Sequence, residues 1–387
     1  MKSVLFVTGH APRDRVGAFA RLHEREHVEF ALFGGHSQHG FEVAAGDACD
    51  AHPATDAAAR AAARDLPFPH RHVAQRELGA LAASGRYRAV VCSTGGRLAL
   101  PAAWAGARRA RTPLILWTSL WAHPRSAAHL ASYLALRRLY RSADAVVTYG
   151  PHVSAYVRAR GARNVHIAPQ SVDNAFWAAP DLASAEVASA ASIWPASAAV
   201  KFLFAGRASR EKGSRALIEA WSDSGLSAPS AALVLVGVGS APPWVPAGGA
   251  VRRDLVCLDP LAPSRLRALY AAADALVVPS IPTRTFREPW GLVVNEAMNR
   301  QLPVIASDAV GAVAGGLVRD GRNGLVAPAG DTAALARALR RLAADAPLRA
   351  RLGAAAAADV RAYTHDAWAA GFSAALASLG LSGEGRW

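Results

Sequence analysis

Two glutamates, Glu288 and Glu296, lie eight residues apart in the segment R-E-P-W-G-L-V-V-N-E-A-M, which runs from Arg287 to Met298. Pro289 suits the first turn of a helix, where its missing N–H has no partner to lose, and Gly291 lets the backbone approach a ligand closely. The first N–H groups of a helix that begins here can hold a phosphate or diphosphate. Glu296 would follow Glu288 by roughly 12 Å at about 1.5 Å per residue. One glutamate would therefore reach a sugar on one side of a diphosphate, and the other a ribose on the opposite side.

Apolar segments surround this pair in a regular order. A-L-V-V-P-S at Ala275 to Ser280 precedes it, and L-P-V-I-A-S-D at Leu302 to Asp308 follows it. Further along come D-G-R-N-G-L-V at Asp320 to Val326 and G-D-T-A-A-L-A-R-A-L from Gly330 to Leu339. With this context the motif resembles the E-x7-E motif of retaining glycosyltransferases of the GT-B fold, and the surrounding chain resembles glycosyltransferase family 4. A bare pair of glutamates at this spacing is otherwise read as two solvated helix positions.

The resemblance assigns roles to the motif residues. It implies that Glu288 holds sugar hydroxyls and that Glu296 holds the ribose, while the residues between them, Pro289, Trp290, Gly291, Leu292 and Val293, bind the nucleotide sugar. No Asp-x-Asp group stands beside these residues. We therefore expect neither a metal nor a cofactor besides the donor substrate.

A second cluster, F-L-F-A-G-R-A-S-R-E-K-G from Phe202 to Gly213, places Arg207 and Lys212 after a predicted strand. The resemblance implies that these cations clamp the donor diphosphate and offset the charge that grows on the leaving group. The alternative is ordinary surface charge. A lysine here favours the first reading, because the chain uses arginine almost everywhere else.

Four further residues carry weaker signals. Gly237 lies in a G-x-G that lacks the third glycine of a dinucleotide fingerprint. The resemblance implies that this strand ends beside the nucleotide, where Gly237 would pack against it. Asp259 is either a base contact or a turn or helix-cap residue. His123 lies just beyond a strand end, and the resemblance implies a catalytic cleft residue that contacts the donor sugar or the reacting centre; the alternative is a structural loop residue. Gly17 resembles a glycine of the family's first loop, although the usual paired glycine is missing.

Strands alternate with helices in both halves of the chain, which predicts an α/β protein. The resemblance implies a GT-B fold in which two Rossmann-like doubly wound domains face a central cleft. We expect an acceptor-binding domain over residues 1–172, a linker over 173–199, a donor-binding domain over 200–365 and a C-terminal helix over 366–387 that crosses back to the first domain. The predicted strands are Val4 to Thr8, Glu29 to Phe33, Ala89 to Ser93, Leu114 to Thr118, Ala145 to Tyr149, Val165 to Ala168, Lys201 to Ala205, Ala232 to Val236, Leu255 to Leu258, Ala275 to Pro279, Val304 to Ala306 and Gly324 to Val326.

The composition narrows the kinds of protein that this chain could be. A chain of 387 residues that is 52% hydrophobic can form two or three buried cores. Its three cysteines have no metal-ligand spacing, and no stretch reaches the roughly 18 apolar residues of a membrane span. We therefore expect a cytoplasmic enzyme.

The net charge of +14 is concentrated in the first 174 residues, where 22 Lys and Arg face 12 Asp and Glu. This favours a phosphorylated or lipid-linked acceptor, or peripheral contact with the anionic inner face of the membrane. Nucleic acid is disfavoured, since no recognised binding motif is present. Ala127 to Arg141 is expected to form an amphipathic helix that faces either the core or a membrane.

The combined expectation is a retaining glycosyltransferase that transfers a sugar from a nucleotide diphosphate sugar to a glycan, lipid-linked or small-molecule acceptor, in bacterial cell-surface glycan or glycolipid synthesis. One alternative is a catalytically silent nucleotide-sugar-binding or scaffold protein of the same fold. A second, an NAD-dependent oxidoreductase, would need the dinucleotide loop that the sequence lacks.

Overall fold

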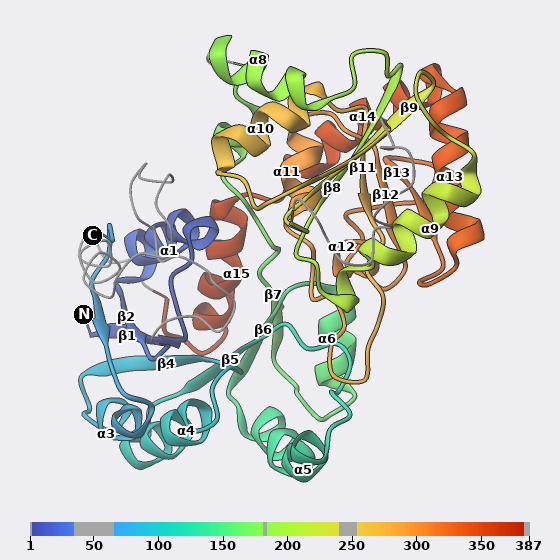
Figure 1. Ribbon diagram of the computed structural model, residues 1–387. Coiled ribbons are helices and arrows are strands. Elements are labelled where there is room, and N and C mark those ends of the chain that lie inside the picture. Colours follow the sequence, from blue (N-terminus) through green and yellow to red (C-terminus); the bar gives the residue numbers. More distant parts are fainter. Residues whose placement is uncertain (1, 35–65, 181–183, 240–253, 383–387) are drawn as a thin grey trace. The chain divides into compact units, whose positions relative to one another are not determined.

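The computed structural model describes residues 2–34, 66–180, 184–239 and 254–382 (Figure 1). By its internal contacts the chain forms two compact units. Unit 1 combines Met1–Asp173 with Tyr363–Trp387, and unit 2 is Asn174–Ala362. Of the residues expected to link the domains, 174–199 lie in unit 2, and the segment 366–387 that was expected to form the crossing helix belongs to unit 1.

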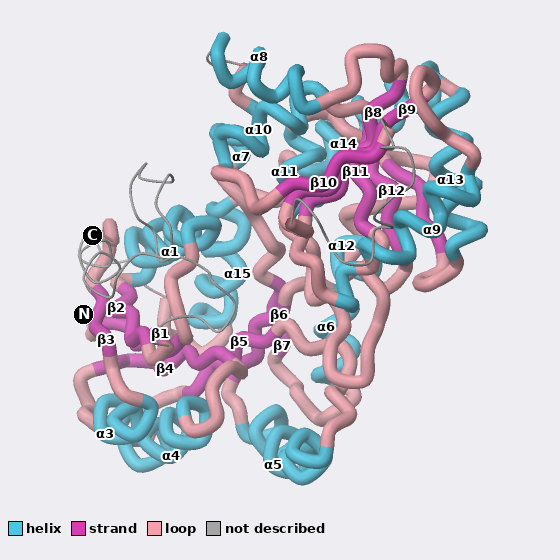
Figure 2. The backbone as a smooth tube through the Cα atoms, viewed as in Figure 1, coloured by secondary structure: helices cyan, strands magenta, loops and turns pink. Residues whose placement is uncertain are grey.

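Unit 1 is built on a seven-stranded parallel sheet in the order β3-β2-β1-β4-β5-β6-β7 (Figure 2). The chain moves outward from β1 to β3 and then returns to β4 on the other side, so the winding direction reverses between β1 and β4. The strands are β1 (Ser3–Thr8), β2 (Val28–Leu32), β3 (His70–His72), β4 (Tyr87–Ser93), β5 (Leu114–Thr118), β6 (Ala145–Thr148) and β7 (Val165–Ile167).

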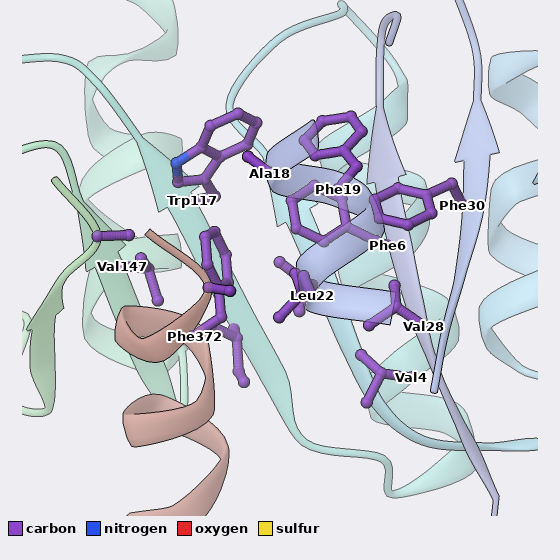
Figure 3. Close-up of a cluster of buried hydrophobic side chains, with 14 of the residues drawn as sticks. Val4, Phe6, Ala18, Phe19, Leu22, Val28, Phe30, Trp117, Val147 and Phe372 are labelled. Carbon is purple, nitrogen blue, oxygen red and sulfur yellow. The ribbon is translucent and has the colours of Figure 1, made fainter. Parts of the chain in front are cut away.

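Helices cover both faces of this sheet. On one face, α1 (Arg13–Glu26) and α15 (His365–Ala377) enclose an aromatic core in which Phe6, Phe19, Trp117 and Phe372 meet (Figure 3). The other face is packed by α3 (Leu78–Ala82), α4 (Ala99–Ala110), α5 (Ala127–Ser142) and α6 (Pro151–Arg158), after the short 3-10 turn η2 (Gln75–Glu77). The segment after residue 362 thus completes the core of unit 1.

A buried arginine joins three distant parts of unit 1. The Arg88 side chain, 8% exposed, pairs with Glu26, whose side chain is fully buried, at 2.7 Å. Arg88 also donates to the backbone carbonyls of Lys2 at 2.9 Å and Leu381 at 3.0 Å. A single guanidinium therefore ties β4 to α1 and to both ends of the chain.

Unit 2 contains a six-stranded parallel sheet in the order β10-β9-β8-β11-β12-β13, and its winding reverses between β8 and β11. The strands are β8 (Val200–Ala205), β9 (Ala231–Val236), β10 (Leu255–Leu258), β11 (Ala275–Val278), β12 (Val304–Ser307) and β13 (Gly324–Ala327). The helices are α7 (Asn174–Ala178), α8 (Ser184–Ile193), η3 (Arg210–Lys212), α9 (Ser214–Ser224), α10 (Pro263–Ala272), α11 (Val293–Asn299), α12 (Gly311–Ala314), α13 (Thr332–Ala344) and α14 (Ala346–Val360).

The two doubly wound parallel sheets confirm the predicted fold class, and each of the twelve predicted strands matches an observed strand to within two residues at either end. The thirteenth, β3, was not predicted. Its sequence, His-Arg-His, has no apolar residue because it forms the edge of the sheet beyond β2.

A charge network in unit 2 leads to a pH-dependent prediction. Hydrogen bonds from Arg322, Asn323 and Arg319 outweigh burial and lower the pKa of Asp359 from 3.8 to about 2. A depressed carboxyl pKa contributes stability above the unfolded value, and this contribution is lost as the pH falls from 3.8 towards 2. We expect Asp359→Asn to lower the free energy of unfolding by about 1–2 kcal/mol at neutral pH and to flatten its acid dependence.

Chemical denaturation across this pH range would measure both effects. Asp223→Asn is a suitable control, because Asp223 is exposed in the same unit. Equal acid sensitivity of Asp359→Asn and the wild-type protein would contradict the assignment.

Candidate functional site

The loops that follow β8 and β11 meet at the carboxyl edge of the unit 2 sheet. Gly213, at φ +72°, starts α9, and a Cβ placed on it would lie 2.0 Å from the Pro279 carbonyl oxygen. Only glycine permits this approach. The Ile281 N–H donates to the Glu211 carbonyl at 2.9 Å, which fastens the turn η3 to the loop after β11.

This junction brings Lys212 and Glu288 together across 76 residues of sequence. The Lys212 ammonium donates to Glu288 Oε2 at 2.6 Å, and the two side chains are 22% and 7% exposed. The Ser280 hydroxyl donates to the same carboxylate oxygen at 3.3 Å. The pair follows β8 and β11, the two neighbouring strands at which the winding reverses, where open α/β sheets bind their ligands.

Arg207, also placed after β8, faces a carboxylate that was not predicted. Its guanidinium lies 3.7 Å from Glu211, and the Arg207 side chain is 45% exposed. Burial raises the pKa of Glu211, but the neighbouring Ser209 side chain and the charges of Arg207 and Lys212 lower it more, so this pKa is lowered overall. Glu211 is therefore an ionised carboxylate beside Arg207, and it also feels the charge of Lys212.

The motif helix begins within the predicted segment, but later than its start. The helix α11 starts at Val293, so Pro289 lies outside it, and the estimate of Glu288 and Glu296 spaced along a single helix is wrong. Gly291 at φ +89° turns the chain into the helix. Trp290 is buried, and its indole N–H donates to Asn295 Oδ1 at 2.8 Å. This hydrogen bond links the loop before α11 to the helix itself.

Glu296 lies in the first turn of α11 and pairs with a tyrosine. The Tyr270 hydroxyl donates to Glu296 Oε2 at 2.9 Å. Burial, followed by the nearby Glu296 charge and this hydrogen bond, raises the pKa of Tyr270, which is fully buried. Tyr270 thus remains a neutral donor that orients the carboxylate.

Gly237 and Asp259 follow the two outer strands β9 and β10. Gly237 has φ +87°, and a Cβ there would lie 2.7 Å from the Gly206 carbonyl oxygen. This glycine permits close packing between the strand ends, which is a structural reason for the G-x-G sequence. Asp259 Oδ1 lies 3.9 Å from the Cβ position of Gly239, so its carboxylate faces the end of β9.

His123 of unit 1 has partners at both ring nitrogens. Nε2 contacts the His129 carbonyl at 2.8 Å, and Nδ1 contacts the Tyr156 hydroxyl at 3.4 Å. The ring also packs edge-on against Tyr133, with centroids 4.9 Å apart. These contacts fit the structural reading of His123.

Gly17 lies inside α1 rather than in a loop, so that expectation is wrong. A Cβ at Gly17 would lie 2.5 Å from the His365 ring. The glycine therefore allows α1 and α15 to pack closely.

Sequence reasoning did not single out Ser280, Tyr270 or Glu211. Ser280 and Glu211 could have been proposed from the sequence, since each follows a predicted strand and therefore lies at the carboxyl edge of the sheet. Tyr270 carried none. Among the described residues there is no group of three or more His, Cys, Asp or Glu side chains that could hold a metal ion.

Known proteins resemble this chain in sequence over part of its length and in fold. Residues 199–345 match the family model described as "Glycosyl transferases group 1". A D-inositol 3-phosphate glycosyltransferase of Corynebacterium glutamicum is 37% identical over 141 residues, which are 35% of this chain and 31% of that protein. The corresponding protein of Nocardia farcinica is 40% identical over 127 residues, 32% of this chain and 24% of the relative. The chain thus spans less than a third of the length of these curated relatives.

Solved structures resemble the whole chain. Anabaena HepE in complex with UDP has a TM-score of 0.72 at 18% identity, with 97% of this chain and 100% of that chain covered. Sucrose-phosphate synthase from Thermosynechococcus elongatus has a TM-score of 0.68 at 20% identity and covers 98% of this chain and 99% of its own. The chain therefore has the fold of the GT-B glycosyltransferases, and its second unit contains the segment that matches the group 1 glycosyl transferase model.

Proposed function

We propose that this protein is a retaining glycosyltransferase of family 4 that transfers a sugar from a nucleotide diphosphate sugar to a hydroxyl acceptor. The observation that carries the proposal is the Lys212–Glu288 pair, held at the carboxyl edge of unit 2 where the winding of the sheet reverses. The match of residues 199–345 to a glycosyl transferase model supports it. So do the structural relatives whose complexes contain UDP and UDP-glucose.

In the proposed reaction, Lys212 and Arg207 stabilise the diphosphate as the bond between the anomeric carbon and the diphosphate oxygen breaks. The acceptor oxygen bonds to the anomeric carbon from the face that the diphosphate leaves, and the acceptor proton passes to the departing diphosphate. The configuration at the anomeric carbon is therefore retained. Glu288 accepts hydrogen bonds from sugar hydroxyls, and Glu296, oriented by Tyr270, accepts them from the ribose.

No metal or cofactor is part of this proposal, since two cationic side chains supply the charge that the leaving diphosphate requires. For the acceptor we propose a phosphorylated or lipid-linked compound of cell-surface glycan or glycolipid synthesis. The basic charge of the first 174 residues supports this class. The names of the curated relatives, which contain inositol phosphate, also support it.

Product analysis tests the reaction. We expect the protein to release a nucleoside diphosphate from at least one member of a panel of UDP-, GDP- and ADP-sugars, with faster release once an acceptor is supplied. Nuclear magnetic resonance of the product should show the donor's anomeric configuration. An inverted product would refute the retaining mechanism.

The catalytically silent binder remains the second candidate. It is favoured by Gly17, which lies inside α1 and supplies no glycine-rich loop. Thermal stabilisation by a nucleotide sugar, without turnover in any donor and acceptor combination, would support this second function.

A further inference from the structure

The helix α5 turns large apolar side chains away from the protein. Leu130 is 62% exposed and Leu134 is 70% exposed, whereas Leu139 and Tyr140 near its C-terminal end are buried. At about 100° per residue, Leu130 and Leu134 lie roughly 140–180° around the helix from Leu139. The expectation of a core-facing helix is thus wrong for these two leucines, which form an outward stripe.

Arginines continue the same stripe. Arg138 is four residues beyond Leu134, and Arg141 is seven beyond it, spacings that keep them on one helix face. Both are exposed, and α5 contains no acidic residue. The stripe therefore passes from leucine to arginine along a single side of the helix.

This stripe belongs to a basic face of unit 1. Residues 78–172 contain thirteen arginines and one acidic residue, Asp144. Arg88 is buried against Glu26, but the helices of this segment carry five exposed arginines, Arg108, Arg109, Arg138, Arg141 and Arg158. The helices of this segment, α3 to α6, all pack on the same side of the sheet (Figure 1). Asp144 is exposed and offsets one of these charges, and its carboxylate also accepts a hydrogen bond from the Leu114 backbone N–H at 2.8 Å.

The exposed half of α5 lies at the ligand edge of its sheet. The helix starts after the carboxyl end of β5, and its first turn is fixed by the contact of His123 Nε2 with the His129 carbonyl at 2.8 Å. A surface that covers Leu130 and Leu134 would therefore meet unit 1 beside the edge where α/β sheets bind their ligands.

From this arrangement we propose that the Leu130–Leu134 stripe of α5, with Arg138 and Arg141 and the basic face around it, docks on an anionic lipid surface. Apolar side chains enter the boundary between headgroups and acyl chains, while arginines pair with lipid phosphates. A second copy of the chain would bring two like-charged faces together, and nucleic acid would leave the leucines in water. None of the helices in the described residues is long and apolar enough to cross a membrane.

Vesicle sedimentation tests the proposal with the full chain. We expect the protein to sediment with vesicles of phosphatidylcholine and phosphatidylglycerol, not with phosphatidylcholine alone, and to be released as salt is raised. Leu130→Ser with Leu134→Ser should weaken the partition about tenfold, because both side chains leave the acyl boundary. Arg138→Glu with Arg141→Glu should weaken it at least as much.

The matched control is Arg337→Glu with Arg341→Glu, which makes the same charge change on exposed residues of α13 in unit 2. It should sediment almost like the wild-type protein. Equal binding by the leucine pair and the wild type, or equal losses in the two arginine pairs, would overturn the docking surface.

A change from dimer to monomer in the leucine variant, with no vesicle binding by the wild type, would identify self-association instead. Binding to an oligonucleotide that resists the leucine changes, again without vesicle binding, would also refute the proposal. The measurement requires no turnover, so its failure would leave the proposed reaction untouched.

Discussion

Replacing Lys212 with alanine is expected to lower turnover of the nucleotide sugar by about a hundredfold to a thousandfold, the usual effect of removing one preorganised group that stabilises transition-state charge. The ammonium lies 2.6 Å from Glu288 at the carboxyl edge of unit 2, where it is held ready for a diphosphate. Steady-state kinetics with the accepted donor would measure the effect on kcat.

The structure changes one part of the expectation for this variant. From the sequence, Lys212→Ala should leave the melting temperature nearly unchanged. The Glu288 side chain, however, is only 7% exposed and would lose its ion pair with Lys212. A lower melting temperature is therefore expected, and activity must be compared below the unfolding transition.

Lys201→Ala is the matched control for Lys212→Ala. Lys201 lies near the start of β8, at the edge of the unit 2 sheet opposite the carboxyl edge that holds Lys212. Its replacement by alanine removes the same positive charge. Its turnover should stay close to that of the wild type. A folded Lys212→Ala protein that also keeps the wild-type rate would remove Lys212 from the proposed mechanism.

Arg88→Ala is expected to lower the free energy of unfolding by about 3–5 kcal/mol, because it removes the arginine that pairs with the fully buried Glu26 carboxylate. The two backbone bonds to Lys2 and Leu381 are lost as well, so both ends of the chain should loosen. For a unit of this size, the change corresponds to roughly 6–20 °C in melting temperature. Differential scanning calorimetry would measure it.

Two further variants show whether the loss of stability in Arg88→Ala comes from the buried charge of Glu26 or from lost packing. Arg86→Ala removes an exposed arginine two residues away and should change stability little. Glu26→Leu combined with Arg88→Met should recover much of the loss, since apolar side chains often replace a buried ion pair without cost. An Arg88→Ala protein as stable as the Arg86→Ala protein would show that the pair contributes nothing.

Most strands could be predicted because they are short apolar runs buried on both faces, although β7 and β10 are only partly buried. The edge strand His70–His72 escaped prediction, since an edge needs no apolar pattern. Gly17 illustrates a different failure. A glycine fits a loop and a close helix contact equally well, and only the packing of α1 against His365 distinguishes them.

The residue types of the candidate site could be predicted from the sequence, but the contacts between them could not. Glu288 and Lys212 stood out as a carboxylate and a cation after strands, but nothing in the local sequence indicated that they bond to each other. Tyr270 could not be found at all, because its hydroxyl meets Glu296 through the packing of two helices.

The sequence by itself determined the alternation of strands and helices and the residue types that follow each strand. Backbone geometry sets these features through periodicities of two and about 3.6 residues. Only the tertiary structure decided that Lys212 reaches Glu288 and that the leucines of α5 point outward. Strand order and helix rotation depend on contacts between residues far apart in the chain, and a local pattern of apolar residues does not encode those contacts.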